Sequence, residues 1–243
     1  MIKILINGAK GKMGTFSQKI ISNNPKFKIV GLDDIEDNLS EQIKLTKPDV
    51  VLDLTWSSSV YENTKTIIDA GVRPVIGTSG LTLDQINEFK KICEAKKLGG
   101  IVVPSFSVTA VLMMIFAQKA SKYLKNAEII EYYHDKKLEA PSSTVRKLAE
   151  MTAKSNVNSR QRGEESIPNV LGGEYQNIPI HSIRMPGVLA NQEILFGEPG
   201  ETLQIKSTAI NQECFTKGIF LSCQEVMNRD KLYYGLEHFI DLS

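Results

Sequence analysis

The sequence predicts an α/β protein: a parallel sheet with helices on both faces, joined to an α+β domain with a mixed, open sheet. Over the first ~100 residues, short apolar runs alternate with segments whose apolar residues recur at helical spacing. The first apolar run ends directly in a glycine-rich loop. From residue 178 onward, strand-like runs follow one another without helices between them, which indicates a second kind of domain.

In the first part, five apolar runs have the character of buried parallel strands: residues 2–7, 27–32, 50–54, 72–76 and 101–103. Helices are expected after the first, third and fourth of these runs. Met13, Phe16 and Ile20 share one helical face. Gly71 stands where a helix would end in a left-handed residue, and the sequence TLDQ from Thr82 has the form of a capping box.

The second part is expected to begin with an apolar helix and to end in a helix that starts at Phe215. A polar stretch with three glycines is expected to form a long loop, and a Gly-Glu-Pro-Gly cluster is expected to form a turn. The expected elements are helices at 108–124 and 144–153, strands at 127–132, 178–185, 189–196 and 202–209, the loop at 155–177 and the turn at 197–200.

Composition limits the classes of function. The 243-residue chain has 29 Lys and Arg against 28 Asp and Glu, a formal net charge of +1. This balance disfavours nucleic acid and anionic membranes as partners. No apolar run reaches the ~18 residues of a membrane span, and the chain starts without a signal-peptide layout. The scattered Cys93, Cys214 and Cys223 predict free thiols in a reducing cytoplasm and, with three histidines, disfavour a metal site.

The glycine-rich loop predicts a dinucleotide site. Gly8, Gly11 and Gly14 lie between a strand and a helix, where small residues let the backbone approach a pyrophosphate at the helix N-terminus. Asp34, with Asp33 as the alternative, follows about 20 residues later, where a carboxylate binds an adenosine ribose. The alternatives are a tight turn without a ligand and a solvated turn aspartate. A kinase is disfavoured because no Gly-Lys-Ser/Thr follows the loop.

A second candidate site lies between residues 128 and 144. Tyr133, His134, Lys136 and Lys137 follow a predicted strand, and a helix begins around Ser142-Ser143-Thr144. Cations and a helix N-terminus that converge on one place can bind a small polyanion such as a dicarboxylate, with donors available for proton transfer. The alternative is a charged strand end with an ordinary helix cap.

Several segments resemble the 4-hydroxy-tetrahydrodipicolinate reductase (dihydrodipicolinate reductase) family of lysine and diaminopimelate biosynthesis. The segment EIIEYYHDKKLEAPSST resembles the family signature E-x-H-H-x-x-K-x-D-A-P-S-G-T. GAKGKMG resembles its cofactor loop, and IGTSG and PSFSV resemble its nicotinamide-side loops. HSIRMPG, NQEILFG and LYYGLEHF resemble later segments in the same order, so the resemblance covers nearly the whole chain.

The resemblance implies a Rossmann-like dinucleotide-binding domain at residues 1–104 and 216–243 and a substrate-binding and tetramerisation domain at 105–215. It implies a cytoplasmic, homotetrameric oxidoreductase that uses NADH or NADPH to reduce 4-hydroxy-tetrahydrodipicolinate to tetrahydrodipicolinate. Lys137 would donate the proton, His134 would contact the substrate, and Ser143 and Thr144 would bind a substrate carboxylate. The residues in cofactor-binding positions are Gly8, Ala9, Lys10, Gly11, Lys12, Met13, Asp34, Thr55, Gly77, Thr78, Ser79, Val103, Pro104, Ser105 and Phe106.

Some site positions depart from the family pattern. Tyr133 stands where the family usually has its first histidine, the general acid/base, so Tyr133 joins Lys137 as a candidate catalytic residue. With an unperturbed pKa near ~10, a tyrosine is a poor base unless a nearby lysine lowers that pKa. Further departures are Ser105, Thr109, Glu139, Ser143, residues 207–209 and Gln212.

These departures leave three functions open: the reductase of the lysine pathway, a reductase of another cyclic imine or enamine diacid, and a non-catalytic NAD(H)-binding protein. We also expect NADH to be preferred over NADPH. Asp34 would repel the 2′-phosphate, and the next residue, Ile35, cannot pair with it.

Overall fold

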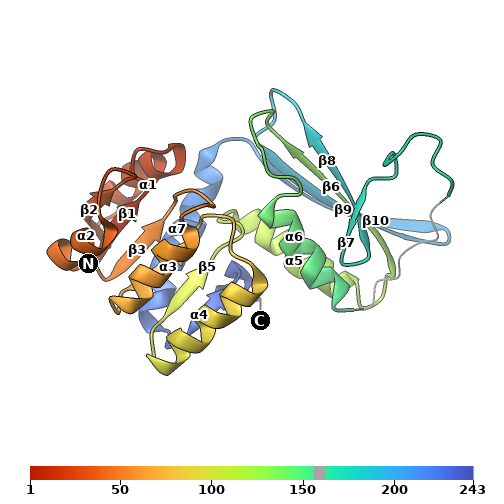
Figure 1. Ribbon diagram of the computed structural model, residues 1–243. Coiled ribbons are helices and arrows are strands. Elements are labelled where there is room, and N and C mark those ends of the chain that lie inside the picture. Colours follow the sequence, from red (N-terminus) through yellow and green to blue (C-terminus); the bar gives the residue numbers. More distant parts are fainter. Residues whose placement is uncertain (156–162, 243) are drawn as a thin grey trace. The chain divides into compact units, whose positions relative to one another are not determined.

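A computed structural model describes residues 1–155 and 163–242 (Figure 1). The chain divides into two compact units. Unit 1 comprises Met1–Phe106 and Phe215–Ser243, and unit 2 comprises Ser107–Cys214. Each unit contains one sheet. Together the two sheets confirm the predicted fold class, a parallel Rossmann-like sheet plus a mixed sheet.

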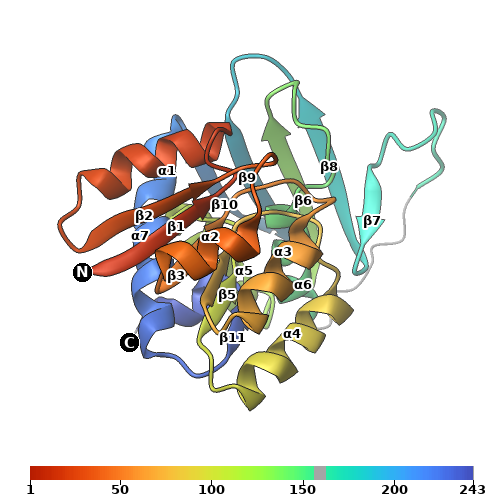
Figure 2. The same cartoon turned by 60° about the vertical axis from the view of Figure 1, so that its left-hand side comes forward.

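Unit 1 is built around a six-stranded parallel sheet in the order β11-β5-β4-β3-β1-β2. Its strands are β1 (Ile2–Asn7), β2 (Phe27–Asp33), β3 (Val50–Asp53), β4 (Arg73–Ile76), β5 (Gly100–Val102) and β11 (Leu232–Tyr234). Helices α1 (Lys12–Ser22) and α7 (Thr216–Glu225) cover one face, and α2 (Leu39–Thr46), α3 (Val60–Asp69) and α4 (Leu83–Ala95) cover the other (Figures 1 and 2). Short 3₁₀ helices span Gln212–Phe215, Val226–Asn228 and Leu236–Phe239.

The core of unit 1 explains why the apolar runs become central strands. Leu5, Val51 and Ile76 are fully buried on one face of the sheet, where they pack with Ile67 and Phe89 of the covering helices. Burying each such side chain contributes about 1.5–3 kcal/mol. Two local predictions are confirmed at the helix ends. Gly71 has a φ of +70°, and Thr82 forms a capping box with Gln85.

Two elements of unit 1 were not predicted. Helix α2 begins after Asn38, whose side chain accepts a hydrogen bond from the backbone N–H of Glu41, and it buries Ile43. Strand β11 pairs in parallel with β5, so the prediction of a helical end to the chain is wrong for Leu232–Tyr234. Three residues are too few for a periodic signal. This strand forms because its backbone pairs with the open edge of β5.

Unit 2 contains a mixed sheet in the order β10-β9-β6-β8-β7. Strands β6 and β8 are parallel, and the other pairs are antiparallel. Its elements are α5 (Val108–Ala120), β6 (Asn126–Tyr133), α6 (Ser143–Ala153), β7 (Gly173–Tyr175), β8 (Ile178–Arg184), β9 (Ala190–Glu198) and β10 (Glu201–Ala209). Alternate residues of β6 are buried, and α6, which packs against α5, also contacts this strand. Figure 2 shows both helices beside the sheet.

Three predicted boundaries in unit 2 are corrected. The helix predicted over 108–124 ends at Ala120, and the loop predicted over 155–177 contains strand β7, while its residues 156–162 lie outside the described residues. The turn predicted at 197–200 shrinks to Pro199-Gly200, because Gly197 and Glu198 still pair with β10. Within residues 1–155 and 163–242, no helix combines the length and the apolar character needed to cross a membrane.

Candidate functional site

The glycine loop lies at the carboxyl end of β1, and its backbone conformation requires glycine. Gly8 has a φ of +82°, and a Cβ there would lie 2.6 Å from the carbonyl oxygen of Leu54. A Cβ on Gly14 would overlap the carbonyl oxygen of Gly8. Close approach of the strand end to the first turn of α1 is the arrangement that places helix N–H groups at a phosphate. The loop therefore fits a dinucleotide.

The two adjacent aspartates after β2 have opposite environments. Asp34 is partly exposed; its carboxylate accepts hydrogen bonds from the backbone N–H groups of Ile35, at 2.9 Å, and Lys10, at 2.7 Å. These two bonds lower the pKa of Asp34. Asp33 is 2% exposed, and its Oδ1 has no hydrogen-bond partner among the described residues. Burial, with smaller contributions from neighbouring acids, raises the pKa of Asp33 to about 6.

A buried carboxylate that the sequence analysis did not single out connects three strand ends. Asp53, at the end of β3, accepts hydrogen bonds from Asn7 Nδ2 at 2.8 Å, Thr55 Oγ1 at 2.9 Å, Thr78 Oγ1 at 2.5 Å and Asn63 Nδ2 at 3.0 Å. Burial raises the pKa of Asp53, and the hydrogen bonds from the threonines oppose that effect. Asp53 thus holds Thr55 and Thr78, two predicted cofactor residues. The signal available in the sequence was a charged residue that ends a buried strand.

The remaining predicted cofactor residues lie in loops of unit 1 or in the first turn of α1. Lys12 and Met13 begin α1, Gly77 to Ser79 follow β4, and residues 103–106 follow β5. A Cβ on Gly77 would lie 2.5 Å from a ring carbon of the buried Phe106, so the loops after β4 and β5 pack directly together. All predicted cofactor residues therefore follow the carboxyl ends of parallel strands, where ligands of such sheets bind.

The second predicted site lies in unit 2, where β6 meets α6. Tyr133 ends β6 with 8% of its surface exposed. Its hydroxyl accepts a hydrogen bond from Gln192 Nε2 at 2.9 Å and is also hydrogen-bonded to the side chains of Ser142 and Thr144. Burial raises the pKa of Tyr133. Tyr133 could serve as a base only if a nearby lysine lowered its pKa, and this condition is not met.

The loop after Tyr133 carries the predicted proton donor. Lys137 Nζ lies 3.1 Å from Glu139 Oε2 and 5.6 Å from the centre of the Tyr133 ring. Glu139 is also paired with Arg146 of α6. The partly buried His134 begins the same loop, and its carbonyl accepts a hydrogen bond from the backbone N–H of Lys137. The loop thus brings the Lys137 cation close to the Tyr133 ring.

Helix α6 supplies the other side of this cluster. Ser142 caps the helix by accepting a hydrogen bond from Val145 N at 3.2 Å, so Ser143 and Thr144 form its first turn. The first N–H groups of a helix and its dipole favour an anion. The structure therefore groups Tyr133, Lys137, Ser143 and Thr144 near one helix start, and His134 directly follows Tyr133 in the chain. It also adds Gln192, which no sequence pattern near Tyr133 pointed to.

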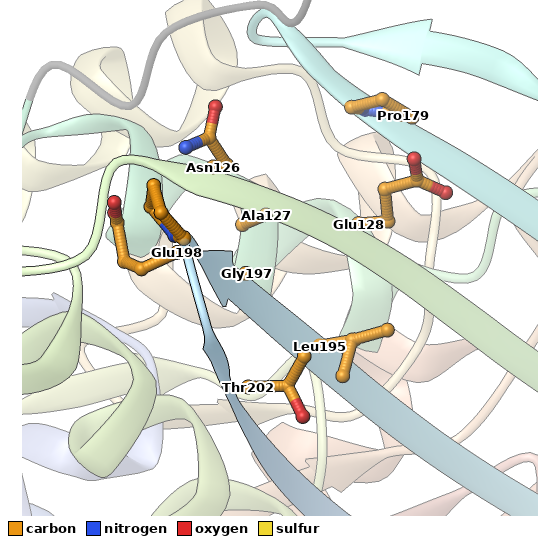
Figure 3. A pocket seen from close by; sticks show the side chains of 9 residues that line it. Asn126, Ala127, Glu128, Pro179, Leu195, Gly197, Glu198 and Thr202 are labelled. Atoms are coloured by element: carbon orange, nitrogen blue, oxygen red, sulfur yellow. The ribbon is translucent and has the colours of Figure 1, made fainter.

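Two pockets border the sheet of unit 2. One, of about 410 Å³, is lined by residues that include Glu128, Leu195 and Thr202 and lies at the start of β6 (Figure 3). Tyr133 is at the other end of this strand, about 20 Å away at ~3.3 Å per residue. The second, of about 650 Å³, is lined by Pro141, Arg146 and other residues beside the α6 start. Among the described residues, no cluster of His, Cys, Asp or Glu could hold a metal ion.

Comparisons with known proteins cover both units. The family model "Dihydrodipicolinate reductase, N-terminus" matches residues 2–106, and "Dihydrodipicolinate reductase, C-terminus" matches residues 109–240. The chain is 49% identical over 240 residues to a 4-hydroxy-tetrahydrodipicolinate reductase of Legionella pneumophila, covering 98% of this chain and 99% of the relative. It is 43% identical to one of Coxiella burnetii, with the same coverage.

Solved structures give a similar result. A dipicolinate-bound dihydrodipicolinate reductase from Paenisporosarcina sp. matches with a TM-score of 0.82 and 38% identity, covering 99% of this chain and all of the other. A dehydrogenase from Clostridium difficile matches with a TM-score of 0.59 at 14% identity, covering 95% of this chain and 92% of the other. The second likeness shows only that the fold is shared.

Proposed function

Because this chain belongs to the dihydrodipicolinate reductase family, we propose that its loops in unit 1 bind NAD(P)H and its cluster in unit 2 binds the substrate that this cofactor reduces. The chain is an oxidoreductase of lysine and diaminopimelate biosynthesis, which converts 4-hydroxy-tetrahydrodipicolinate to tetrahydrodipicolinate. The observation that carries the proposal is the convergence of Lys137, Tyr133 and the α6 start. Dipicolinate bound to a relative supports a dicarboxylate ligand.

The residues present fit the cofactor. The glycine loop leaves no room for side chains at Gly8 and Gly14, so the backbone can approach a pyrophosphate. When bound, NAD(P)H supplies the hydride. In unit 2, Ser143 and Thr144 bind a substrate carboxylate through the first turn of α6, and His134 contacts the substrate.

We assign proton donation to Lys137 rather than to Tyr133. Lys137 carries three N–H donors at the end of a flexible side chain, and Glu139 holds its Nζ at 3.1 Å beside the Tyr133 ring. The Tyr133 hydroxyl is buried and bonded to Gln192, and its raised pKa makes it a weaker acid. Tyr133 remains the second candidate for the catalytic role, and its hydroxyl also supports Thr144.

A preference for NADH is part of the proposal. Asp34 lies at the end of β2 with its carboxylate ionised, and a 2′-phosphate there would meet a like charge. Lys10 could offset this repulsion, but its Nζ lies 3.1 Å from Glu36. A like-charge contact in a partly exposed site is worth ~1–2 kcal/mol, so we expect NADH to bind roughly tenfold more tightly than NADPH. Parallel titrations with NADH and NADPH test this. Asp34→Ala should weaken NADH binding and reduce the difference in affinity between the two cofactors.

We further propose a cytoplasmic homotetramer. Helices α5 and α6 pack on one face of the unit 2 sheet, and side chains of the other face, among them Ile130, Tyr132 and Leu195, are only partly buried within the described chain. A sheet face with such side chains favours self-association. Light scattering of the wild type and of Leu195→Glu, which places a charge on that face, tests it. A monomeric wild type would contradict the tetramer.

One turnover experiment separates the three functions that the sequence left open. NADH oxidation is followed with the freshly made condensation product of pyruvate and aspartate semialdehyde. We expect turnover, whose rate follows the enzyme concentration. Turnover of another ring imine alone would favour a related substrate, and NADH binding without turnover of any ring imine would favour a non-catalytic protein.

A further inference from the structure

We propose that Arg184 and Glu131 are positioning residues that hold the Lys137 loop and the start of α6 in one arrangement, so that the proton donor and the carboxylate-binding turn face the same substrate. The inference rests on the proposed roles of Lys137, Ser143 and Thr144. Neither Arg184 nor Glu131 belongs to the predicted set of site residues. Both lie in unit 2, on neighbouring parallel strands β6 and β8.

Glu131 is a fully buried carboxylate that joins three elements. It accepts hydrogen bonds from the backbone N–H of Ser142 at 3.0 Å, from Ser182 Oγ at 2.8 Å and from Arg184 Nη2 at 2.7 Å. Burial alone would raise the pKa of Glu131, but the bonds from Ser142 and Arg184 outweigh it and keep the group ionised. Through Ser142, the helix cap, this carboxylate sets where α6 begins.

Arg184 fixes the other side of the site. Its Nη2 donates to the carbonyl oxygen of Glu139 at 2.7 Å, and its Nε donates to the carbonyl oxygen of Lys137 at 3.2 Å. Its guanidinium carbon lies 5.3 Å from the centre of the Tyr133 ring. One planar group thus binds two carbonyls of the loop and the carboxylate of Glu131. An ammonium group, which lacks this rigid fork of donors, cannot replace it.

The two contacts form one continuous connection. The backbone of Lys137 is tied to Arg184, Arg184 to Glu131, and Glu131 to the cap of α6. Glu139, whose carbonyl is held by the same guanidinium, pairs with the ammonium of Lys137. Because the substrate would contact both the ammonium and the first turn of α6, an error in their separation would weaken binding and misplace the proton donor.

Arg184→Lys is the direct test, because it keeps the positive charge next to Glu131 and removes the fork. Its matched control is Arg229→Lys in unit 1. Arg229 also pairs with a carboxylate, at 2.6 Å from Glu225, and also lies over aromatic rings. Three quantities are measured for both variants: kcat/KM for the ring substrate, the affinity for dipicolinate as a non-reacting probe, and the affinity for NADH.

We expect Arg184→Lys to lower kcat/KM and dipicolinate affinity by roughly 10–100-fold, the range of one or two lost charge-assisted hydrogen bonds. NADH affinity should stay within about twofold, since unit 1 is unaltered, and Arg229→Lys should change neither substrate measurement. An unchanged dipicolinate affinity in Arg184→Lys, or an equal loss in Arg229→Lys, would overturn the proposal.

Two further results keep this inference separate from the proposed function. If Arg184→Lys does not fold, Glu131→Gln is used instead. Its amide oxygen can still accept a hydrogen bond from Ser142, but the negative charge that holds Arg184 is gone. We expect the same loss of kcat/KM and dipicolinate affinity, with NADH affinity unchanged. If the wild type shows no turnover, the proposed function fails, but the ratio of dipicolinate affinities between variant and wild type still decides the role of Arg184.

Discussion

Replacing Asp33 with asparagine should stabilise the folded protein at neutral pH. The Asp33 side chain is 2% exposed, and one of its oxygens has no hydrogen-bond partner among the described residues. Burial raises its pKa from an ordinary 3.8 to about 6. At neutral pH the folded state therefore holds a poorly solvated negative charge that the unfolded chain solvates well.

The pKa difference sets both the size and the pH dependence of the effect. Folding favours the protonated Asp33, so this residue destabilises the fold fully above pH 6, and the penalty disappears as the pH falls through 6 toward 3.8. A difference of about two pKa values corresponds to about 3 kcal/mol. Burying the asparagine amide has its own desolvation cost, which reduces the gain. We therefore expect Asp33→Asn to raise the free energy of unfolding at pH 7.5 by about 1–3 kcal/mol.

Urea denaturation of the cofactor-free wild type and Asp33→Asn, at pH 7.5 and at pH 4.5, measures the difference in their free energies of unfolding. The gain should be largest at pH 7.5 and should be mostly lost at pH 4.5, where the wild-type Asp33 is itself protonated. Asp34→Asn is the matched control, since hydrogen bonds lower the pKa of Asp34 and its charge is stabilising. A variant Asp33→Asn that is less stable than the wild type at pH 7.5, or a gain that does not depend on pH, would refute the reasoning.

Three further predictions concern the sites. Tyr133→Phe should keep the maximal rate within a few-fold of the wild type if Lys137 donates the proton. The variant should lose about 1–2 kcal/mol of unfolding free energy in a thermal melt, because Gln192 loses its buried acceptor. Loss of one limb of the pH–rate profile would instead identify Tyr133 as the donor. Lys137→Ala and Thr144→Val should each lower kcat/KM roughly 10–150-fold with little change in NADH affinity, as steady-state kinetics and NADH titration will show. Gly14→Ala should weaken NADH binding at least about tenfold, because its Cβ would overlap the Gly8 carbonyl, and unchanged binding in a titration would contradict the assigned loop.

Much of unit 1 could be predicted because its signals are local. The strand from Ile2 to Asn7, the glycine loop and the helix after it occupy one short stretch of chain, and their periodicity and small residues specify strand, turn and helix together. The left-handed Gly71 and the capping box at Thr82 are likewise decided by neighbours within four residues. Composition and order of elements were sufficient for the fold class.

The interior of the unit 2 site could not be predicted in the same way. Gln192 lies 59 residues from Tyr133 in the sequence, and Arg184 lies 53 residues from Glu131. These pairs meet because β6 aligns with β8 on one side and β9 on the other, in a particular register. A shift of one residue in that register would turn each side chain to the opposite face of the sheet. No local pattern near Tyr133 records which partner it receives.

The α/β class, the glycine loop and the segment that carries His134, Lys137 and Thr144 could be predicted from the amino-acid sequence, because each depends on residues close together in the chain. Three features became known only from the folded chain: which of the adjacent Asp33 and Asp34 is buried, that the Tyr133 hydroxyl is bonded to Gln192, and that the short strand β11 pairs with β5. These outcomes depend on strand pairing and on burial against distant segments. Hydrogen-bond partners, and with them pKa values, follow from that packing and not from residue type alone.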